Sequence, residues 1–130
     1  MKLSTKGKYG LRAIIDLARF SEKEPVSIGC IATRQKLSER YLEQLFALLK
    51  KAGLVKSIRG ASGGYVLARD ASEISVGDVL RALEGNLEPV RCAAFYSEEG
   101  CMASDVCVTK YVWQKINDSI NKTVNEIKLD

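Results

Sequence analysis

The sequence predicts a mainly α-helical fold in which four helices and one β-hairpin form a compact unit that is followed by a long C-terminal helix. Three observations predict it. Helical apolar spacing recurs in the first half, two strand-like runs flank a glycine-rich turn, and the last part of the chain carries a coiled-coil pattern. The 130 residues suffice for one domain with an appended element, but not for a second full domain.

Three helices are expected before the hairpin. The first runs from about Thr5 to Phe20, and its apolar stripe consists of Leu11, Ile14, Ile15 and Ala18. The second, at about 28–35, follows the N-capping residue Ser27, but Cys30 stands where Glu or Gln would complete a capping box. The third follows Ser38 and ends before Gly53. Its core stripe consists of Leu42, Leu45, Phe46 and Leu49.

Two strand-like runs, at 54–58 and 65–68, follow the third helix and flank the turn Arg59–Gly64. A fourth helix is expected after Ser75, with Asp78 at the capping-box position and Gly85 at its end. The apolar residues of this helix are Val76, Val79, Leu80 and Leu83. A short link between the second and third helices, followed by a hairpin, is typical of a winged helix-turn-helix, which we therefore expect to span residues 1–85.

The charge of the chain is unevenly distributed. Residues 1–69 contain 14 Lys and Arg against 5 Asp and Glu, whereas residues 70–130 contain 6 against 11, which gives net charges of about +9 and −5. A basic surface attracts a nucleic-acid backbone through phosphate neutralisation and counterion release, although a solvated lysine-rich surface has the same composition. Together with the expected fold, this asymmetry predicts double-stranded DNA as the partner.

The second helix of a helix-turn-helix enters the major groove of DNA. In this chain its outward residues would be Ser38, Glu39, Arg40, Tyr41, Glu43, Gln44 and Lys51. Arg40 and Gln44 can make bidentate contacts with guanine and adenine, and Glu43 can accept a hydrogen bond from a cytosine amine. In the hairpin, Arg59 is expected to enter the minor groove while small residues let the backbone approach phosphates. These small residues are Gly60, Ser62, Gly63 and Gly64. A solvated helix face and a loose turn are the alternatives.

The C-terminal segment, from about Asp105 to Leu129, carries the seam pattern of a coiled coil. Its seam residues are Trp113, Ile116, Ile120, Thr123 and Ile127. Such a helix is roughly 35 Å long, too long for a small domain to cover. We therefore expect residues 105–130 to form a dimerisation helix that pairs with a second copy across a two-fold axis, and a palindromic operator with half-sites about one DNA turn apart. Folding back onto its own domain is the alternative.

Cys92 and Cys101 lie in an aperiodic segment at 86–104, and Cys107 lies just beyond it, so we expect residues 86–107 to form a cysteine-bearing cluster loop. The sequence has neither a signal-peptide pattern nor an apolar run long enough for a membrane span, so we expect a cytoplasmic protein without membrane contact. Clustered cysteines in a reducing compartment more often bind metal or perform redox chemistry than form disulfides. Their spacing lacks the CxxC pairs of a zinc ribbon, whereas iron–sulfur clusters are held chiefly by thiolates.

The fourth ligand of such a cluster stays open, because the chain contains no histidine. A carboxylate, an exogenous thiol or water, a residue of the partner subunit, or Cys30 could occupy the position. Three unligated, reduced cysteines are the alternative to a cluster.

Three stretches of the chain resemble the Rrf2 family of bacterial transcription regulators, and the resemblance covers nearly the whole sequence. MKLSTKGKYGLRAIIDLA is similar to the family's first helix, LSERYLEQLFALLKKAGLVKSIRGASGGYVLARD to its recognition helix and wing, and ISVGDVLRALEG to the following helix. Three cysteines before a long helix resemble the family's iron–sulfur branch. That resemblance implies a homodimer with a [2Fe–2S] cluster on Cys92, Cys101 and Cys107, whose occupancy alters promoter choice, and control of genes for iron–sulfur cluster biogenesis.

By position, the resemblance also implies that the 38–44 face reads the major groove and that Arg59 engages the minor groove, with Glu43 at a position linked to site discrimination. The chain departs from the family in the spacing between Cys92 and Cys101, which is longer than in the best-known members, and at three further positions. Lys110 replaces a histidine expected after the last cysteine, Lys8 replaces an acidic ligand of the nitric-oxide-sensing branch, and Cys30 replaces an acidic residue.

Two other functions are consistent with the sequence. Another Rrf2 branch implies a cluster-free repressor of cysteine and sulfur metabolism that is controlled by a partner enzyme. A thiol enzyme or cluster carrier is the alternative from a different class, but the chain has no histidine to pair with a thiolate. We therefore predict a regulator rather than an enzyme.

Overall fold

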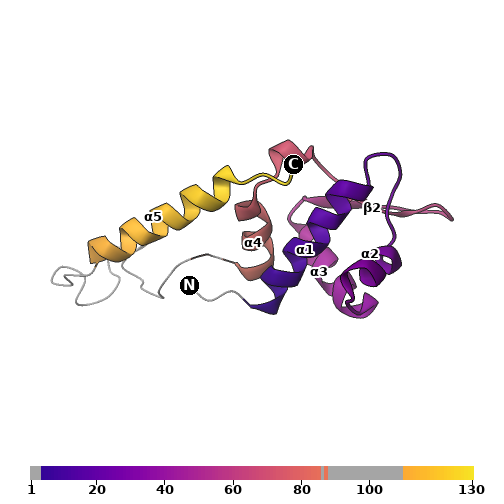
Figure 1. The fold of residues 1–130 in the computed structure, drawn as a ribbon, viewed down its shortest axis with the longest axis horizontal. Helices are drawn as coiled ribbons and strands as arrows, with labels where there is room; N and C mark the ends of the chain where they lie inside the picture. The colour runs from indigo at the N-terminus through magenta and orange to yellow at the C-terminus, as the bar shows by residue number, and fades with distance from the viewer. Residues whose placement is uncertain (1–3, 86, 88–109) are drawn as a thin grey trace.

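A computed structural model describes residues 4–85, 87 and 110–130 of the chain. Its elements are α1 (Thr5–Phe20), α2 (Ile28–Gln35), α3 (Glu39–Lys51), β1 (Val55–Ile58), β2 (Gly64–Leu67), the 3-10 helix η1 (Ala71–Glu73), α4 (Val76–Glu84) and α5 (Lys110–Glu126). The hairpin projects from one end of the helical unit and α5 from the other, with α1 and α4 between them (Figure 1). The predicted mainly α-helical fold with a hairpin is confirmed. No helix within the described ranges is long and apolar enough to cross a membrane.

Residues from all of the first four helices and from the hairpin form a single core. Its fully buried side chains include Ile14, Leu17, Ile31, Leu42, Leu45, Phe46, Leu49, Val55, Ile74 and Val79. The predicted apolar stripe of α3 is confirmed, because all four of its residues are buried. The predicted stripe of α1 is partly wrong, since Ile15 is 38% exposed while Ala13 and Leu17 are buried.

Two glycines explain the different buried face of α1. A Cβ atom placed on Gly10 would overlap the side chain of Leu83, and one on Gly7 would lie 2.8 Å from Oε1 of Glu84. Both positions face α4, so the glycines allow the two helices to pack closely. The glycine side of α1 therefore faces the core, and the helix is rotated relative to the stripe expected from its larger apolar residues.

Serine side chains cap the starts of the helices. Ser27 accepts a hydrogen bond from the backbone N–H of Cys30, and Ser38 accepts one from that of Tyr41, as expected. Ser75 and Asp78 form the predicted capping box, with two hydrogen bonds of 3.0 Å. Burial raises the pKa of Asp78. Its hydrogen bonds with Ser75 and the charges of two nearby arginines together lower the pKa by more, so the net shift is downward.

The predicted C-terminal limit of α5 is wrong. The helix ends at Glu126, and Lys128 instead forms an antiparallel bridge with Ser75. The backbone N–H of Leu129 donates to the carbonyl groups of Ala71 and Ile74, and the Leu129 side chain is buried in the core. Burial of Leu129 and the hydrogen bonds near the start of α4 stabilise the C-terminal segment more than one further turn of helix would. Residues 105–109 of the predicted helix lie outside the described part of the chain.

Candidate nucleic-acid interface

The outward face of α3 carries most of the predicted DNA-reading residues. Leu42, Leu45 and Leu49 hold the opposite face in the core. The residues left exposed are Ser38, Glu39, Arg40, Glu43 and Gln44. This division follows from the 3.6-residue period of the helix, and it leaves the side chains suited to base-edge contacts open to solvent.

Tyr41 differs from the other predicted contacts because it is half-buried against α1. Its hydroxyl group lies 3.3 Å from Oγ1 of Thr5, and its ring makes an edge contact with Tyr9, with the centroids 6.4 Å apart. The Lys8 ammonium and the Arg12 guanidinium each lie 5.5 Å from the Tyr9 ring centroid. Tyr41 thus anchors the first turn of α3 on α1, a role that the sequence did not indicate.

Glu39 also lies close to a neighbouring helix. A Cβ atom on Gly29 would lie 3.1 Å from Oε1 of Glu39, which places this carboxylate beside the first turn of α2. A negative charge is favourable near a helix N-terminus. Glu39 therefore has a stabilising environment within the helix-turn-helix. The longer exposed side chains of α3 that remain available to a ligand are Arg40, Glu43 and Gln44.

The hairpin is fixed at its base and exposed at its tip. β1 and β2 pair antiparallel from Val55 opposite Leu67 to Ile58 opposite Gly64. Tyr65 exchanges two backbone hydrogen bonds with Val26, of 2.8 and 3.0 Å, and its ring packs on Phe46 with the centroids 4.9 Å apart. The segment before α2 therefore acts as a third pairing partner for the hairpin.

The glycines of the turn have distinct roles. Gly60, at φ +119°, adopts a backbone conformation that favours glycine, and its carbonyl accepts a 3.0 Å hydrogen bond from Gly63. A Cβ atom on Gly63 would overlap the Ile58 carbonyl, and one on Gly64 would overlap the Val26 carbonyl. Gly63 and Gly64 are thus required by the hairpin itself. The residues exposed at the tip of the turn are Arg59, Gly60 and Ser62. Their contacts with phosphates and the minor groove remain predictions.

A polar cluster joins α1 to α2 and holds the helix-turn-helix together. The carboxylate of Asp16, a 3% exposed residue, accepts hydrogen bonds from Arg34 at 2.7 to 3.1 Å and from Nε2 of Gln35 at 2.9 Å. Arg12 in turn donates to the side-chain and backbone oxygens of Gln35 at 3.2 and 3.1 Å. These contacts fix the C-terminal end of α2, from which the chain turns into α3.

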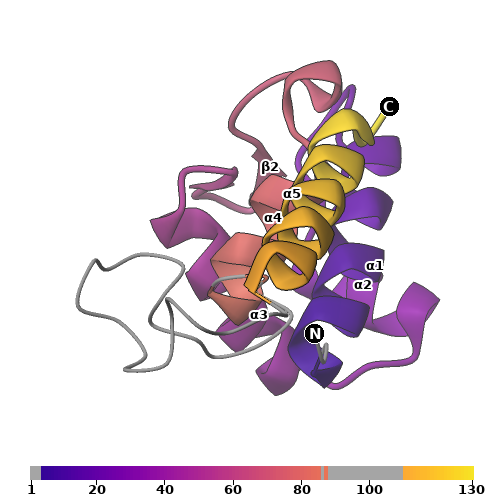
Figure 2. The same cartoon turned by 90° about the vertical axis from the view of Figure 1, so that its left-hand side faces the viewer.

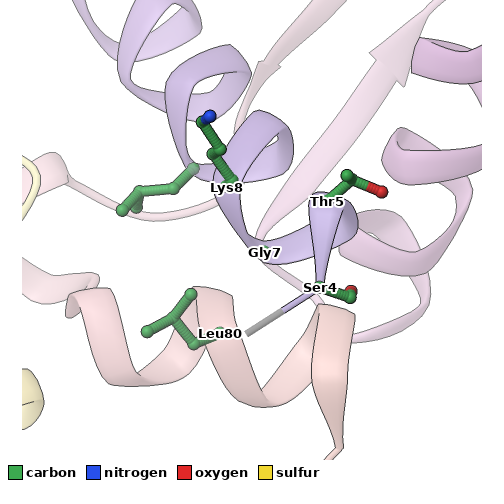
Figure 3. A pocket seen from close by; sticks show the side chains of 6 residues that line it. Ser4, Thr5, Gly7, Lys8 and Leu80 are labelled. Atoms are coloured by element: carbon green, nitrogen blue, oxygen red, sulfur yellow. The ribbon is translucent and has the colours of Figure 1, made fainter. Parts of the chain in front are cut away.

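A cavity of about 430 Å³ lies between α1 and α4, and Figure 3 shows its lining side chains. It is lined by Ser4, Thr5, Gly7, Lys8, Leu11 and Leu80. These residues supply two hydroxyl groups and one ammonium group, but no pair of acid and base that would support catalysis.

The predicted cluster ligands Cys92, Cys101 and Cys107 lie outside the described residues. In the described part of the chain, no group of three His, Cys, Asp or Glu side chains is placed to hold a metal ion. Cys30 is exposed in the first turn of α2, where its backbone N–H donates to Ser27.

The model of the Rrf2 family, described as an iron-dependent transcriptional regulator, matches residues 3–130. The chain belongs to the Rrf2 family. The match spans the helix-turn-helix, the hairpin and α5, and so covers every element described above.

Named relatives include regulators of two kinds. The HTH-type transcriptional regulator IscR of Serratia proteamaculans is 43% identical over 99% of this chain and 77% of its own length. The structure of T. potens IscR is 50% identical, with a TM-score of 0.77 over 99% of this chain and 83% of that one. CymR, described as the global cysteine regulator of B. subtilis, is 41% identical, with a TM-score of 0.81 over 99% and 93% of the two chains.

This Rrf2 protein is therefore a DNA-binding transcriptional regulator rather than an enzyme. The comparisons agree with the winged helix-turn-helix architecture, in which α3 is the second helix of the helix-turn-helix and the β1–β2 hairpin is the wing.

Proposed function

We propose that this Rrf2 protein is a cytoplasmic homodimeric repressor or dual regulator whose promoter choice is tuned by a [2Fe–2S] cluster, and that it controls genes of iron–sulfur cluster biogenesis. The observation that carries the proposal is the presence of Cys92, Cys101 and Cys107 between α4 and the end of the chain. It is supported by 43% and 50% identity to two regulators named IscR.

The proposed DNA surface combines α3 with the wing. Arg40 and Gln44 would contact purine edges in the major groove, and Glu43 would discriminate among sites by accepting from cytosine and repelling misplaced phosphates. Arg59 at the exposed wing tip would enter the minor groove. Ser38 and Ser62 would bind phosphates, as would the backbone around the turn glycines. The exposure of these side chains supports this assignment.

The proposed dimer is supported by apolar side chains on the projecting part of α5. Tyr111, Val112 and Ile116 are 76%, 54% and 37% exposed in the single chain. Large apolar side chains exposed together on one helix indicate a surface that a partner covers. A second α5 across a two-fold axis would cover them and would present two recognition helices to a palindromic operator.

The proposed cluster would be held by the three cysteine thiolates. A bound iron–sulfur cluster supplies a group that responds to iron supply and oxidation. The donor set fits the chemistry of such a cluster, because thiolates are its usual ligands, but three cysteines leave one position for another group. Cys30 is one candidate for that position, alongside a carboxylate, an exogenous thiol or a residue of the partner subunit.

A cluster-free repressor of cysteine and sulfur metabolism, controlled by a partner enzyme, is the second candidate. The observation that favours it is the similarity to CymR, the global cysteine regulator of B. subtilis, which is 41% identical over 99% of this chain. Under this alternative, replacement of the three cysteines would leave promoter recognition unchanged.

Anaerobic purification distinguishes the two candidates. Visible absorption, iron and acid-labile sulfide per subunit would be measured for the wild type and for Cys92→Ala, Cys101→Ala and Cys107→Ala. Cys30→Ala would be measured alongside them, and it reports whether Cys30 supplies the fourth ligand. A coloured wild type whose iron and colour are lost in all three variants supports the cluster. A wild type that stays colourless after anaerobic reconstitution with iron and sulfide contradicts it and favours the cluster-free repressor.

A further inference from the structure

Arg81 of α4 joins α4 to α5 through two hydrogen bonds. Its Nη1 donates to Oδ1 of Asn125 at 2.8 Å, and its Nη2 donates to Oδ1 of Asn121 at 2.6 Å. Nδ2 of Asn121 donates in turn to the carbonyl of Asn117 at 2.8 Å, which fixes the orientation of that amide. One guanidinium group therefore holds side chains from two successive turns of α5.

A close approach of the two helices accompanies these hydrogen bonds. A Cβ atom on Gly77 would overlap Oδ1 of Asn125 and would lie 3.0 Å from Cγ2 of Val124. Gly77 is buried, and it lies on α4 one turn before Arg81. The missing side chain lets α5 pack against α4 where the Arg81 guanidinium reaches across, so packing and hydrogen bonding act at the same place.

The residues after α5 provide a second attachment to the same domain. The backbone N–H of Val76 donates to the carbonyl of Ile127 at 2.7 Å. Two residues later, Leu129 is buried in the core. The C-terminal end of α5 is therefore held at two places, whereas its other end projects from the domain with Tyr111 and Val112 exposed (Figures 1 and 2).

A helix held at one end acts as a lever. α5 contains 17 residues, which corresponds to a length of about 25 Å at roughly 1.5 Å per residue. A rotation of about 10° at the held end moves the far end of such a helix by roughly 4 Å. That displacement is close to the rise of one DNA base pair, about 3.4 Å. The direction of α5 would therefore decide which half-site spacing a dimer accepts.

We propose that Arg81 is a positioning residue that fixes the direction of α5, and thereby the distance and rotation between the two recognition helices of a dimer. This inference rests on the proposed α5-mediated homodimer. A guanidinium group suits the role because its planar array of donors fixes the acceptors in direction as well as distance. A lysine at position 81 would have a single ammonium group on a flexible chain. A methionine there would keep the apolar packing of the side chain but would donate no hydrogen bonds.

The test uses the full chain and DNA. An operator selected from random sequences with the wild type is remade with one or two base pairs added or removed between its half-sites. Binding by the wild type, Arg81→Met and Arg81→Lys is measured on this series. Lys122→Met is the matched control, because Lys122 is an exposed α5 residue and its replacement removes the same charge. Dimerisation is measured by sedimentation and folding by thermal unfolding.

We expect the wild type and Lys122→Met to prefer the selected spacing by about tenfold over spacings changed by one base pair. Arg81→Met should dimerise but prefer that spacing by about threefold or less, and Arg81→Lys should be intermediate. Asn121→Ala/Asn125→Ala removes the acceptors instead and should also flatten the profile, which keeps the test decisive if Arg81→Met fails to fold. A folded, dimeric variant with an unchanged spacing profile overturns the role of Arg81 alone, whereas a wild type that does not dimerise overturns the proposed dimer as well.

Discussion

Asp16 of α1 pairs with Arg34 of α2 through three hydrogen bonds, in which Nε of Arg34 contacts both carboxylate oxygens and Nη2 contacts Oδ1. The guanidinium of Arg34 also stacks on Phe20, 4.1 Å from the ring centroid. Burial by itself raises the pKa of Asp16, but hydrogen bonds from Arg34 and Gln35, together with the charges of Arg34 and Arg19, outweigh it and lower the pKa below 3.8. The pair holds α2 against α1 and so supports the start of α3.

Asp16→Asn should lower the free energy of unfolding by about 2 kcal/mol, because it weakens a charge-assisted bidentate contact while Arg34 stays partly hydrated. The measurement is urea unfolding followed by circular dichroism. Glu22→Gln, which removes a charge from an exposed position just after α1, is the control and should change stability by less than about 0.5 kcal/mol. If the Asp16 variant and the wild type have equal free energies of unfolding, the pair makes no net contribution to stability.

The stability that Asp16 provides should depend on pH in the acid range. A carboxyl group whose pKa is lower in the folded state stabilises the protein above its unfolded pKa, near 3.8, and this contribution is lost as the pH falls through the folded value. The difference in unfolding free energy between the wild type and Asp16→Asn should therefore be constant from pH 7 to 5 and shrink below about pH 4. A difference that grows on acidification would contradict the assigned shift.

Gly10→Ala should destabilise the protein by about 1 to 3 kcal/mol, because the added methyl group overlaps Leu83 across the α1–α4 contact. Leu83→Ala should also destabilise, but through loss of buried apolar surface. Combined in one chain, the two substitutions should lower the free energy of unfolding by less than the sum of their separate effects. The methyl group added at position 10 would occupy part of the space that the shortened side chain at position 83 leaves empty. Strict additivity in urea unfolding would mean that the helices separate to accommodate the methyl group.

Gly64→Ala should disturb the base of the wing, because a Cβ atom there overlaps the carbonyl of Val26. We expect a loss of about 1 to 3 kcal/mol in stability, together with weaker DNA binding. Ala61→Ser is the control, since Ala61 is exposed in the same turn and is not a proposed contact. Amide hydrogen exchange of Val26 and Tyr65 reports the bridge directly, and unchanged protection in Gly64→Ala would contradict the assigned role.

Local signals predicted most of the helices and the hairpin. Ser75 with Asp78, for example, marks a helix start through contacts only three residues apart, and the α3 stripe needs no knowledge of its neighbours. Contacts between distant residues escaped the prediction. The rotation of α1 depends on Leu83 packing against Gly10, and the end of α5 depends on the bridge between Lys128 and Ser75.

The same distinction applies to the candidate site. Exposure of Arg40, Glu43 and Gln44 follows from helical periodicity once α3 is recognised. The anchoring of Tyr41 on Thr5 joins residues 36 positions apart, and no local pattern indicates it. The placement of the three clustered cysteines lies outside the described residues, so their role as ligands stays a prediction from residue type and family resemblance.

The proposed DNA surface is tested most directly by measuring DNA affinity against salt concentration for the wild type, Gln44→Ala, Arg59→Ala and the control Lys122→Met. On an operator selected with the wild type, Gln44→Ala should lose about 1 to 3 kcal/mol of binding free energy and relax preference at one base pair in each half-site. Arg59→Ala should bind more weakly, while Lys122→Met should bind like the wild type. Wild-type affinity and sequence preference in both Gln44→Ala and Arg59→Ala would contradict recognition by α3 and the wing.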